Sequence, residues 1–412
     1  MAIVVQKYGG TSVAGVGKLR NVAERIMRTK HAGHDLVVVV SAMGDTTDDL
    51  LAMAKQVSAS PDRRELDMLL TAGERISMAL LSMAIRELGG DAISFTGSQS
   101  GIITNDRHVD ARIIEVRPFR VQDELARGKI VVIAGFQGVS YRREVTTLGR
   151  GGSDTTAVAM AAALNADYCE ICSDVDGVYS ADPKDVPAAR RIPALSYEET
   201  QELAESGARV LNAQAVEFAK EKGIAIYARA TSSALPGADP STDGTVVRRH
   251  PPRMPGTVVG VTSERNVLVV EADAETDELL RALDEHHVAG KQLHISTTAR
   301  HATLVVSREN LHDEGRVRAG LAARFGERLR LVDGLGAVSA IGAGINATYV
   351  NVRAGLAALG EAGIDSRGLS TSSFRTTWMV PSDSVAEAVR ALHSRFIEQG
   401  NVNAGAPGRR NG

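Results

Sequence analysis

The chain has 412 residues, of which 43% are hydrophobic and 24% are charged, the usage of a soluble globular protein. Its formal net charge of -3 gives no overall basic field, which argues against nucleic acid or a membrane surface as a partner. The longest clean apolar runs, such as Leu36–Val40 and Ile130–Ala134, have the length of strands and not of membrane spans, and the N-terminus shows no secretory signal. We therefore expect a cytoplasmic protein of two or three domains.

From residue 1 to about 230, short β-branched runs alternate with amphipathic stretches. The expected strands are Ile3–Val5, Leu36–Val40, Ala92–Phe95, Ile130–Ala134 and Tyr168–Ile171. The expected helices are Gly17–Lys30, Thr47–Val57, Leu66–Gly89, Arg117–Arg127 and Val158–Leu164. This alternation predicts a mainly parallel sheet with helices on both faces.

The two cysteines, Cys169 and Cys172, form a CxxC pair at the last of these strands. Such a pair is typical of redox and zinc sites, but no second pair completes a metal site in this sequence. In a strand, residues three apart point to opposite faces. We therefore expect two structural core thiols.

Residues 233–256 are rich in Pro, Gly, Ser and Asp and predict a linker, whose RRHPPR cluster is read as solvated and not as a nucleic-acid patch. Beyond the linker, two stretches share a β-α-β-β rhythm. The expected elements are Val258–Val270, Asp277–His287 and His294–Val306, then Ala337–Ile341, Arg353–Ala362, Gly368–Val380 and a helix at Asp383–Phe396. The tail at residues 401–412 is expected to be disordered.

Two glycine-rich loops indicate binding of an anion. The first, KYGGTS at Lys7–Ser12, combines two glycines, which let the backbone approach an anion, with a lysine for phosphate oxygens. The second, TTLGRGGSDTT at Thr146–Thr156, runs into a helix N-terminus, which favours an anion, and contains Arg150, suited to carboxylate or phosphate. A structural turn requires the glycines but not the charged groups, so the two loops together favour a clamp on a phosphoryl group.

Other polar residues lie near the ends of predicted strands, where open α/β sheets bind ligands. Thr47 and Glu74 are candidate anchors for a carboxylate and an ammonium, although a helix cap and a surface ion pair explain them equally well. The stretch Ser173–Tyr179 (SDVDGVY) offers carboxylates for a metal or for nucleotide hydroxyls, and it also fits an Asx-rich turn.

No histidine lies in these loops, and neither a Ser-His-Asp nor a zinc pattern occurs in the sequence. A kinase whose acceptor is an ionised carboxylate needs no general base, because the nucleophile carries no proton. The residues therefore favour a carboxylate kinase over a hydrolase.

Several long motifs follow one another in order: KYGGTSV, VSAMGDTTDDLL, LDMLLTAGERISMALL, AISFTGSQSGIIT, AGFQGV, TTLGRGGSDTTAVA, SDVDGVYSADP and YEETQELAESGARVL. With them the chain resembles the aspartate kinase family, of the amino-acid kinase superfamily, from Met1 to about Arg229. The resemblance implies phosphorylation of the side-chain carboxylate of aspartate by MgATP, the first step toward lysine, threonine and methionine. It implies a three-layer α/β kinase domain over residues 1–232, followed by the linker at 233–256. Two ferredoxin-like (βαββαβ) ACT domains would then occupy residues 257–332 and 333–400. The resemblance leaves open whether C-terminal residues complete the first ACT domain.

The resemblance also assigns site residues by motif. The catalytic residues would be Lys7 and Asp154. The residues holding aspartate would be Thr47, Glu74, Arg150 and Ser153. The ATP site would comprise Lys7, Gly9, Gly10, Ser41, Ser173, Asp174, Tyr179 and Arg209, with Mg²⁺ bound through ATP and no separate protein metal site. The family usually has threonine at Ser173 and lysine at Arg209, and both changes keep the hydroxyl or the charge.

The regulatory half resembles the family's ACT pair more weakly. The family's effector loops usually carry a Pro-Gly step, which is missing from Asp273–Thr276 and Thr348–Asn351, and Leu369–Phe374 has serine and phenylalanine where Glu-Ile is usual. Because the backbone of such a loop would grip an effector's carboxylate, we expect weakened or absent feedback by lysine or threonine. ACT pairing implies a homodimer, or a heterotetramer with a small subunit started internally near Met254.

Three alternatives stay open from the sequence. The first is a kinase for another small acidic amino acid or acidic substrate in a specialised pathway, such as a sulfonate or an N-acylated analogue. Glu74 argues for a substrate with a free ammonium. The second is a sibling nucleotide or carbamate kinase, disfavoured by the ACT pair. The third is a catalytically silent ACT-bearing regulatory subunit, disfavoured by the presence of Lys7, Arg150 and Asp154.

Overall fold

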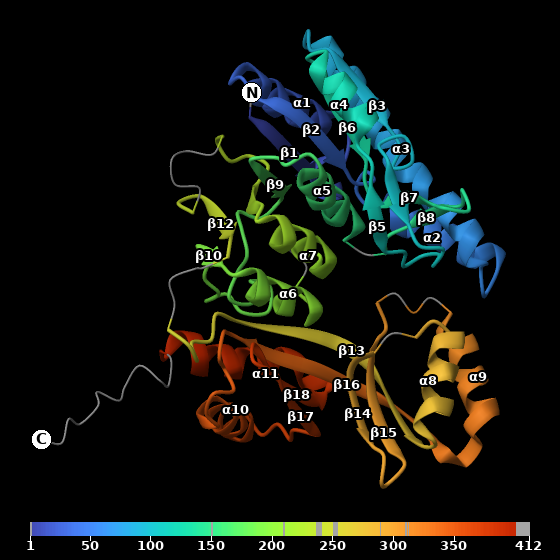
Figure 1. Cartoon of the computed structure of the whole chain (residues 1–412). Helices are drawn as coiled ribbons and strands as arrows, with labels where there is room; N and C mark the ends of the chain where they lie inside the picture. Colours follow the sequence, from blue (N-terminus) through green and yellow to red (C-terminus); the bar gives the residue numbers. More distant parts are fainter. Residues whose placement is uncertain are drawn as a thin grey trace, which may run out of the picture. The chain divides into compact units, whose positions relative to one another are not determined.

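The computed structural model describes residues 2–149, 151–208, 211–235, 241–249, 254–288, 290–309, 311 and 313–400. The chain forms two compact units (Figure 1). The first unit comprises Met1–Val178, Arg191–Gln201 and Arg209–Pro251. The second comprises Tyr179–Arg190, Glu202–Ala208 and Pro252–Gly412.

An eight-stranded sheet is the centre of the first unit, in the order β10-β12-β11-β9-β1-β2-β6-β3. Its strands are β1 (Ile3–Tyr8), β2 (Asp35–Val40), β3 (Ala92–Phe95), β6 (Ile130–Ala134), β9 (Tyr168–Ser173), β10 (Ala194–Leu195), β11 (Ala225–Ala230) and β12 (Gly244–Val247). All neighbours pair in parallel except β11 and β12. The run Leu36–Val40 is fully buried, as expected for a strand covered on both faces. The predicted parallel α/β fold is confirmed.

Helices cover both faces of this sheet. Packed on one face are α1 (Val16–His31) and α3 (Arg63–Glu87), whose apolar residues share a core with Val4 and Tyr8 of β1. The helix α5 (Gly152–Ala163) is buried along its length and packs on β1, β2 and β9. Because side chains of a strand alternate between faces, Lys7 points away from the face of Val4 and Tyr8 and toward α5.

The remaining helices of the first unit are α2 (Thr46–Val57), α4 (Phe119–Ala126), α6 (Tyr197–Glu205), whose last turn belongs to the second unit, and α7 (Ala213–Lys222). Among the described residues, α3 is the one helix long and apolar enough to cross a membrane by length and composition. Its inner face nevertheless carries the buried carboxyl groups of Asp67 and Glu74. This pattern is typical of a core helix of a folded domain.

A second, four-stranded sheet has the order β5-β4-β7-β8. Its strands are β4 (Ile102–Thr104), β5 (Ile113–Val116), β7 (Gln137–Ser140) and β8 (Val145–Thr147). The sequence did not predict this sheet, because strands of three or four residues are too short to show a hydrophobic period. The strand β8 leads directly into the second glycine-rich loop.

The cysteine pair lies in this part of the chain, and the predicted linker begins here. Cys169 and Cys172 are both buried and free in β9, so the prediction of core thiols is confirmed. The stretch predicted to be linker, 233–256, contains β12, and that part of the prediction is wrong. Thr245, Val246 and Val247 are buried in the main sheet, because they supply a β-branched run that completes its edge.

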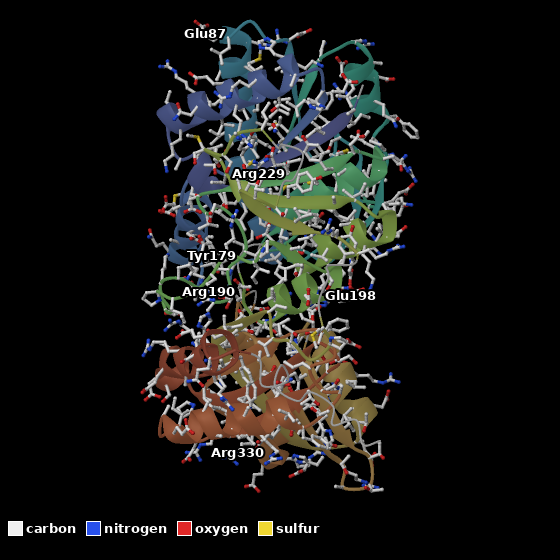
Figure 2. All side chains as sticks on the ribbon, turned by 90° about the vertical axis from the view of Figure 1, so that its left-hand side faces the viewer. Glu87, Tyr179, Arg190, Glu198, Arg229 and Arg330 are labelled. Carbon is white, nitrogen blue, oxygen red and sulfur yellow. The ribbon has the colours of Figure 1, made fainter. Side chains whose placement is uncertain are left out.

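A buried polar cluster joins α1, β9 and β11. The Glu170 carboxylate lies 2.7 Å from Arg25 and 3.3 Å from Arg229, and it accepts a 2.8 Å bond from Gln6. Figure 2 labels Arg229 within the first unit. Burying two guanidinium groups requires such partners, since an unpaired buried charge is strongly destabilising.

The second unit contains a six-stranded antiparallel sheet, β14-β15-β13-β16-β18-β17. Its strands are β13 (Gly260–Asp273), β14 (Gly290–Ser296), β15 (His301–Ser307), β16 (Leu329–Ile341), β17 (Gly368–Thr371) and β18 (Arg375–Pro381). Its helices are α8 (Thr276–Glu285), α9 (Glu314–Phe325), α10 (Val350–Glu361) and α11 (Val385–His393). The long strands β13 and β16 pair with each other at the centre of this sheet (Figure 1).

Those two long strands build two ferredoxin-like modules. The cluster that holds Leu268, α8 and α9 is one core, and the cluster that holds Val261, α10 and α11 is the other. Irregular pairing between Glu264 and Val269 marks the change from one module to the other along β13. The first half of β13 thus belongs to the core of the second module. The sequence had suggested a different exchange, in which C-terminal residues complete the first module. The predicted domain boundaries themselves stay predictions.

Two short segments from the N-terminal half of the chain are built into the second unit. Ser180 lies 2.9 Å from Nε2 of the buried His393, whose Nδ1 lies 2.9 Å from Glu398. Glu202 forms a 3.0 Å ion pair with Arg375. Tyr179 and Arg190, which bound the first of these segments, are labelled in Figure 2.

Gly355 in α10 provides a test of packing in the second module. A Cβ at this position would lie 2.2 Å from Cζ2 of the fully buried Trp378. Gly355→Ala is therefore expected to lower the free energy of unfolding by about 1–3 kcal/mol through overpacking. Urea unfolding followed by the fluorescence of Trp378, the only tryptophan, measures this effect.

Gly360 is the matched control in the same helix, because nothing lies within 4 Å of its added Cβ. Gly360→Ala is expected to raise the free energy of unfolding by about 0.5–1 kcal/mol through helix propensity. Equal effects of the two substitutions would contradict the packing argument.

Candidate active site

The carboxyl ends of four neighbouring parallel strands meet at one edge of the main sheet. Tyr8 of β1 pairs with Val40 of β2 and with Cys172 of β9, and Val40 pairs with Ala134 of β6. The next residues, Gly9, Ser41, Ser173 and Gly135, therefore lie in one row. Open α/β sheets bind their ligands at such an edge.

An ion pair between Lys7 and Asp154 lies at this edge. Nζ of Lys7 is 2.6 Å from Oδ1 of Asp154, and the two side chains are 12% and 7% exposed. Oδ1 has no hydrogen-bond partner among the described residues, so the Lys7 ammonium is the group that offsets its buried charge. The structure thus brings together the ammonium of the first glycine-rich loop and the carboxylate of the second.

The first glycine-rich loop packs tightly against the segment after β2. A Cβ on Gly10 would lie 2.8 Å from the carbonyl oxygen of Ala42, and the Gly10 carbonyl accepts a 3.0 Å bond from Gly44. The Gly9 amide donates to Cys172 at 3.2 Å, so this amide serves the fold and does not point freely toward an anion. A Cβ on Gly9 would lie 3.6 Å from Nζ of Lys7, so glycine keeps the space beside the ammonium open.

The second loop ends at the N-terminus of α5. Gly151 precedes the helix in the left-handed region with φ of 76°, and Asp154 lies in the first turn. Ser153 is buried and lies close to Gly135, the residue after β6, where an added Cβ would be 2.8 Å from the Ser153 Oγ. Backbone amides at a helix N-terminus and the positive end of its dipole favour a negatively charged group here.

Glu74 presents a buried carboxylate to the same region. Its Oε1 accepts a 3.1 Å bond from the amide of Ala42, which follows β2, whereas its Oε2 is buried with no hydrogen-bond partner among the described residues. Burial raises the pKa of Glu74 to about 7, although the Ala42 amide opposes this shift. A buried carboxylate with one unpaired oxygen is suited to bind a cationic group such as an ammonium.

The other predicted residues lie around this centre. Thr47 is half-buried in the first turn of α2, and Ser41 is half-buried at the end of β2. The Ser173 hydroxyl donates to the carbonyl of Val175 at 3.1 Å, and Asp174 is exposed. This geometry fits the Asx-rich turn as well as the nucleotide site that the sequence left open.

Two of the predicted site residues lie outside the described residues, and a third belongs to the second unit. Arg150 and Arg209 lie outside the described residues. Tyr179 is half-buried and is the first residue of a segment assigned to the second unit. Within the described ranges, no group of three His, Cys, Asp or Glu side chains is arranged to hold a metal ion.

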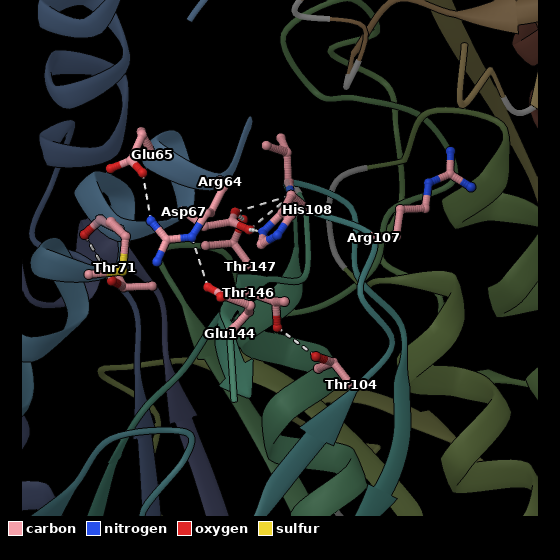
Figure 3. A network of polar contacts seen from close by, with 12 residues as sticks. Arg64, Glu65, Asp67, Thr71, Thr104, Arg107, His108, Glu144, Thr146 and Thr147 are labelled. Carbon is pink, nitrogen blue, oxygen red and sulfur yellow. Dashed lines mark hydrogen bonds and ion pairs between the residues drawn. The ribbon is translucent and has the colours of Figure 1, made fainter. Parts of the chain in front are cut away.

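Sequence reasoning missed Asp67, which is fully buried in α3. Asp67, Thr71 and Glu74 follow the i, i+4, i+7 spacing of one helical face, and all three are buried. A polar stripe on the inner face of an otherwise apolar helix was the signal that could have identified it. Figure 3 shows its contacts.

Comparisons with known proteins agree with this geometry. The model of the amino acid kinase family matches residues 2–228. The aspartokinase of Mycolicibacterium smegmatis is 45% identical, with 96% of each chain covered, and that of Corynebacterium glutamicum is 44% identical, also with 96% of each covered. In fold, the chain is similar to the crystal structure of E. coli aspartokinase III in complex with aspartate and ADP, with a TM-score of 0.82 at 23% identity, covering 96% of this chain and 99% of that one.

Proposed function

Because the chain belongs to the amino acid kinase family and its relatives over the full length are aspartokinases, we propose that it phosphorylates the side-chain carboxylate of L-aspartate with ATP. The observation that carries the proposal is the Lys7–Asp154 pair at the carboxyl edge of the sheet, with the unpaired Glu74 oxygen in the same unit. This combination supplies charge for a phosphoryl group and an anchor for an amino acid. The product is 4-phospho-L-aspartate.

The chemistry follows from the charges of these residues. The aspartate carboxylate is already ionised and attacks the γ-phosphorus of ATP as the bond to ADP breaks, so no proton must be removed. Lys7 neutralises negative charge on the transferring group, and Asp154 holds the Lys7 ammonium in place. Glu74 binds the substrate's ammonium, and Arg150 and Ser153, with Thr47, bind its carboxylate groups.

ATP would lie along the row of strand ends, against Gly9, Gly10, Ser41, Ser173 and Asp174. Mg²⁺ typically keeps several waters and binds through nucleotide phosphates, with one or two carboxylates. The exposed Asp174 carboxylate and the oxygens at this edge have the chemistry that the ion prefers. Its role would be to neutralise the β- and γ-phosphates.

A hydroxylamine-trapping assay of acyl phosphate tests the proposal. Aspartate, glutamate and N-acetylaspartate are supplied with MgATP, and we expect hydroxamate from aspartate and none from the N-acyl analogue, which cannot present an ammonium to Glu74. If only another acidic amino acid gives product, then that amino acid and not aspartate is the substrate. ATP-dependent product from none of them would support the silent regulatory subunit.

We further propose weakened or absent feedback inhibition. The helix α8 begins after Glu275 and carries Asp277 and Glu278 in its first turn. Each of these carboxylates is paired with an arginine, so acidic side chains already occupy the helix N-terminus that an effector's carboxylate would use. At the start of α10, Tyr349 is 80% exposed and the Asn351 side chain is committed to the carbonyl groups of Gly256 and Ile345. Both features oppose binding of an amino acid's carboxylate.

Addition of about 5–10-fold more lysine plus threonine than aspartate is therefore expected to change the initial rate by less than about twofold, because an effector that does not bind cannot shift a conformational equilibrium. Steady-state assays at aspartate near its KM measure this. Strong inhibition by either amino acid would contradict the proposal of weakened feedback.

Assembly and location are also proposals. Edge pairing of the ferredoxin-like modules would give a homodimer, and an internal start near Met254 would give a heterotetramer. Light scattering after gel filtration distinguishes these from a monomer, and Met254→Leu removes the internal start. We place the protein in the cytoplasm, where ATP and aspartate are available.

A further inference from the structure

Asp67 is a buried carboxylate that the mechanism above leaves without a role. Asp67 is fully buried in α3 and receives hydrogen bonds from two other elements (Figure 3). The Thr147 hydroxyl donates to Oδ1 at 2.5 Å, the Val109 amide donates at 3.1 Å, and Nδ1 of His108 lies 2.6 Å from Oδ2. Because a carboxylate only accepts, the His108 ring donates from Nδ1. Burial raises the pKa of Asp67, whereas these donors lower it.

One of the partners is a strained segment between β4 and β5. Val109 has φ of 71°, in the left-handed region that a β-branched residue rarely adopts. Such a conformation persists only where surrounding contacts hold it. The Val109 amide bond to Asp67 is one of these contacts, and the Ala111 amide bond to the Thr147 carbonyl, at 2.9 Å, is another.

The other partner, Thr147, is the last residue of β8. Two residues later Gly149 begins the turn toward α5, with φ of 71° and a 3.0 Å bond from the Gly152 amide to its carbonyl. Leu148 between them is buried and bonded to the Phe136 carbonyl at 2.9 Å. Thr147, Leu148 and Gly149 are thus each held by a contact before the chain reaches Ser153 and Asp154 in the first turn of α5.

On the helix side, Asp67 is rigidly connected to Glu74. The two residues lie seven positions apart on one face of α3, or about 10 Å along its axis. The Gln137 side chain donates to the Thr71 carbonyl between them at 3.2 Å, which fixes this part of the helix to β7.

We propose that Asp67 is a positioning residue for the amino-acid substrate. It joins the helix that carries Glu74 to the strand that leads into the second glycine-rich loop, and so sets the separation between the ammonium site and the carboxylate site. This inference rests on the proposed function, because an aspartate site exists only if aspartate is the substrate. It assigns Asp67 to the aspartate site and not to the ATP site.

A second contact between α3 and the segment before β8 contributes little to the separation between the ammonium site and the carboxylate site. Arg64 of α3 bonds to Glu144, just before β8, at 2.8 Å (Figure 3). Their side chains are 46% and 38% exposed. Exposed ion pairs are weak and screened by salt, so the buried contact at Asp67 determines the geometry.

The adjacent threonines of β8 supply a matched pair of test variants. Both are fully buried, and Thr146 bonds to Thr104 of β4 at 2.6 Å, whereas Thr147 bonds to Asp67. Thr147→Val and Thr146→Val each remove one buried hydroxyl, but only the first cuts the link to α3. We expect Thr147→Val to raise the KM for aspartate by about 10- to 100-fold and to leave the KM for ATP within twofold, because displaced binding groups act on one substrate only.

Thr146→Val should leave both KM values unchanged, since a merely structural loss reduces the active fraction, and hence kcat, without moving KM. An unchanged aspartate KM in Thr147→Val, or an equal rise in Thr146→Val, would overturn the proposal. Wild-type protein assayed in parallel separates the two claims, because absence of aspartyl phosphate from the wild type refutes the proposed function itself and the inference with it.

His108 gives an independent readout should Thr147→Val fail to fold. Its side chain is 20% exposed, so His108→Ala leaves the core intact while removing one donor to Asp67. We expect a smaller rise in aspartate KM for His108→Ala and recovery in His108→Asn, whose amide can replace the Nδ1 donor. An equal KM in His108→Ala and wild type would count against the positioning role.

Discussion

Lys7→Met is expected to lower kcat by about 10³-fold or more, because Lys7 neutralises charge that develops on the transferring phosphoryl group. The substitution keeps the aliphatic stem and removes only the ammonium that lies 2.6 Å from Asp154. Aspartate should still bind, since its anchors are elsewhere in the unit. Single-turnover formation of acyl phosphate, together with the KM values, measures the effect.

The partner carboxylate complicates this experiment. Removing Lys7 leaves Asp154 buried and unpaired, which costs on the order of 3–5 kcal/mol in the free energy of unfolding. The double variant Lys7→Met with Asp154→Asn removes both charges and should recover most of the stability but none of the rate. Recovery of activity in the double variant would contradict a catalytic role for Lys7.

Glu74→Gln is expected to raise the KM for aspartate by about 100-fold at pH 8, through loss of a charge-assisted contact to the ammonium. The amide fits the same space and keeps the bond from the Ala42 amide. In the wild type, the pKa of Glu74 near 7 means that the carboxyl is neutral below that pH. The KM for aspartate should therefore fall by up to about tenfold per pH unit on the acid side and level off above pH 8, and Glu74→Gln should abolish this dependence.

The same substitution should stabilise the folded chain. The folded-state pKa of Glu74, about 7, lies above its ordinary value of 4.5, so the native state binds the proton more tightly than the unfolded state. The free energy of unfolding therefore falls between pH 4.5 and pH 7, by up to about 3 kcal/mol. Glu74→Gln removes this loss and should be more stable than the wild type at pH 8, as expected where a binding group is kept at a cost in stability.

Glu87→Gln is the matched control, because Glu87 is exposed at the end of the same helix. It removes one carboxylate from α3 without touching the site, and neither the aspartate KM nor its pH profile should change. A wild-type KM that does not vary between pH 6 and pH 8 would refute the link between burial of Glu74 and substrate binding.

The sequence by itself determined the parallel sheet and most of its helices. Continuous β-branched runs such as Leu36–Val40 have few alternatives to a buried strand, and the helices between them carry a clear apolar period. It also placed Lys7 near the end of the first strand, which in the structure extends to Tyr8, and Asp154 at a helix start. These signals are local, so they can be identified in the sequence without knowledge of the fold.

Only the tertiary structure decided which of these groups meet. The packing of α5 on β1 places Lys7 against Asp154, and the packing of α3 buries Glu74 enough to raise its pKa to about 7. The short strands of the second sheet, the sharing of β13 between two modules and the contacts of Asp67 were also decided there. Each depends on pairing between distant segments, and the free energy of such pairing comes from burial and hydrogen bonds that no local stretch of sequence contains.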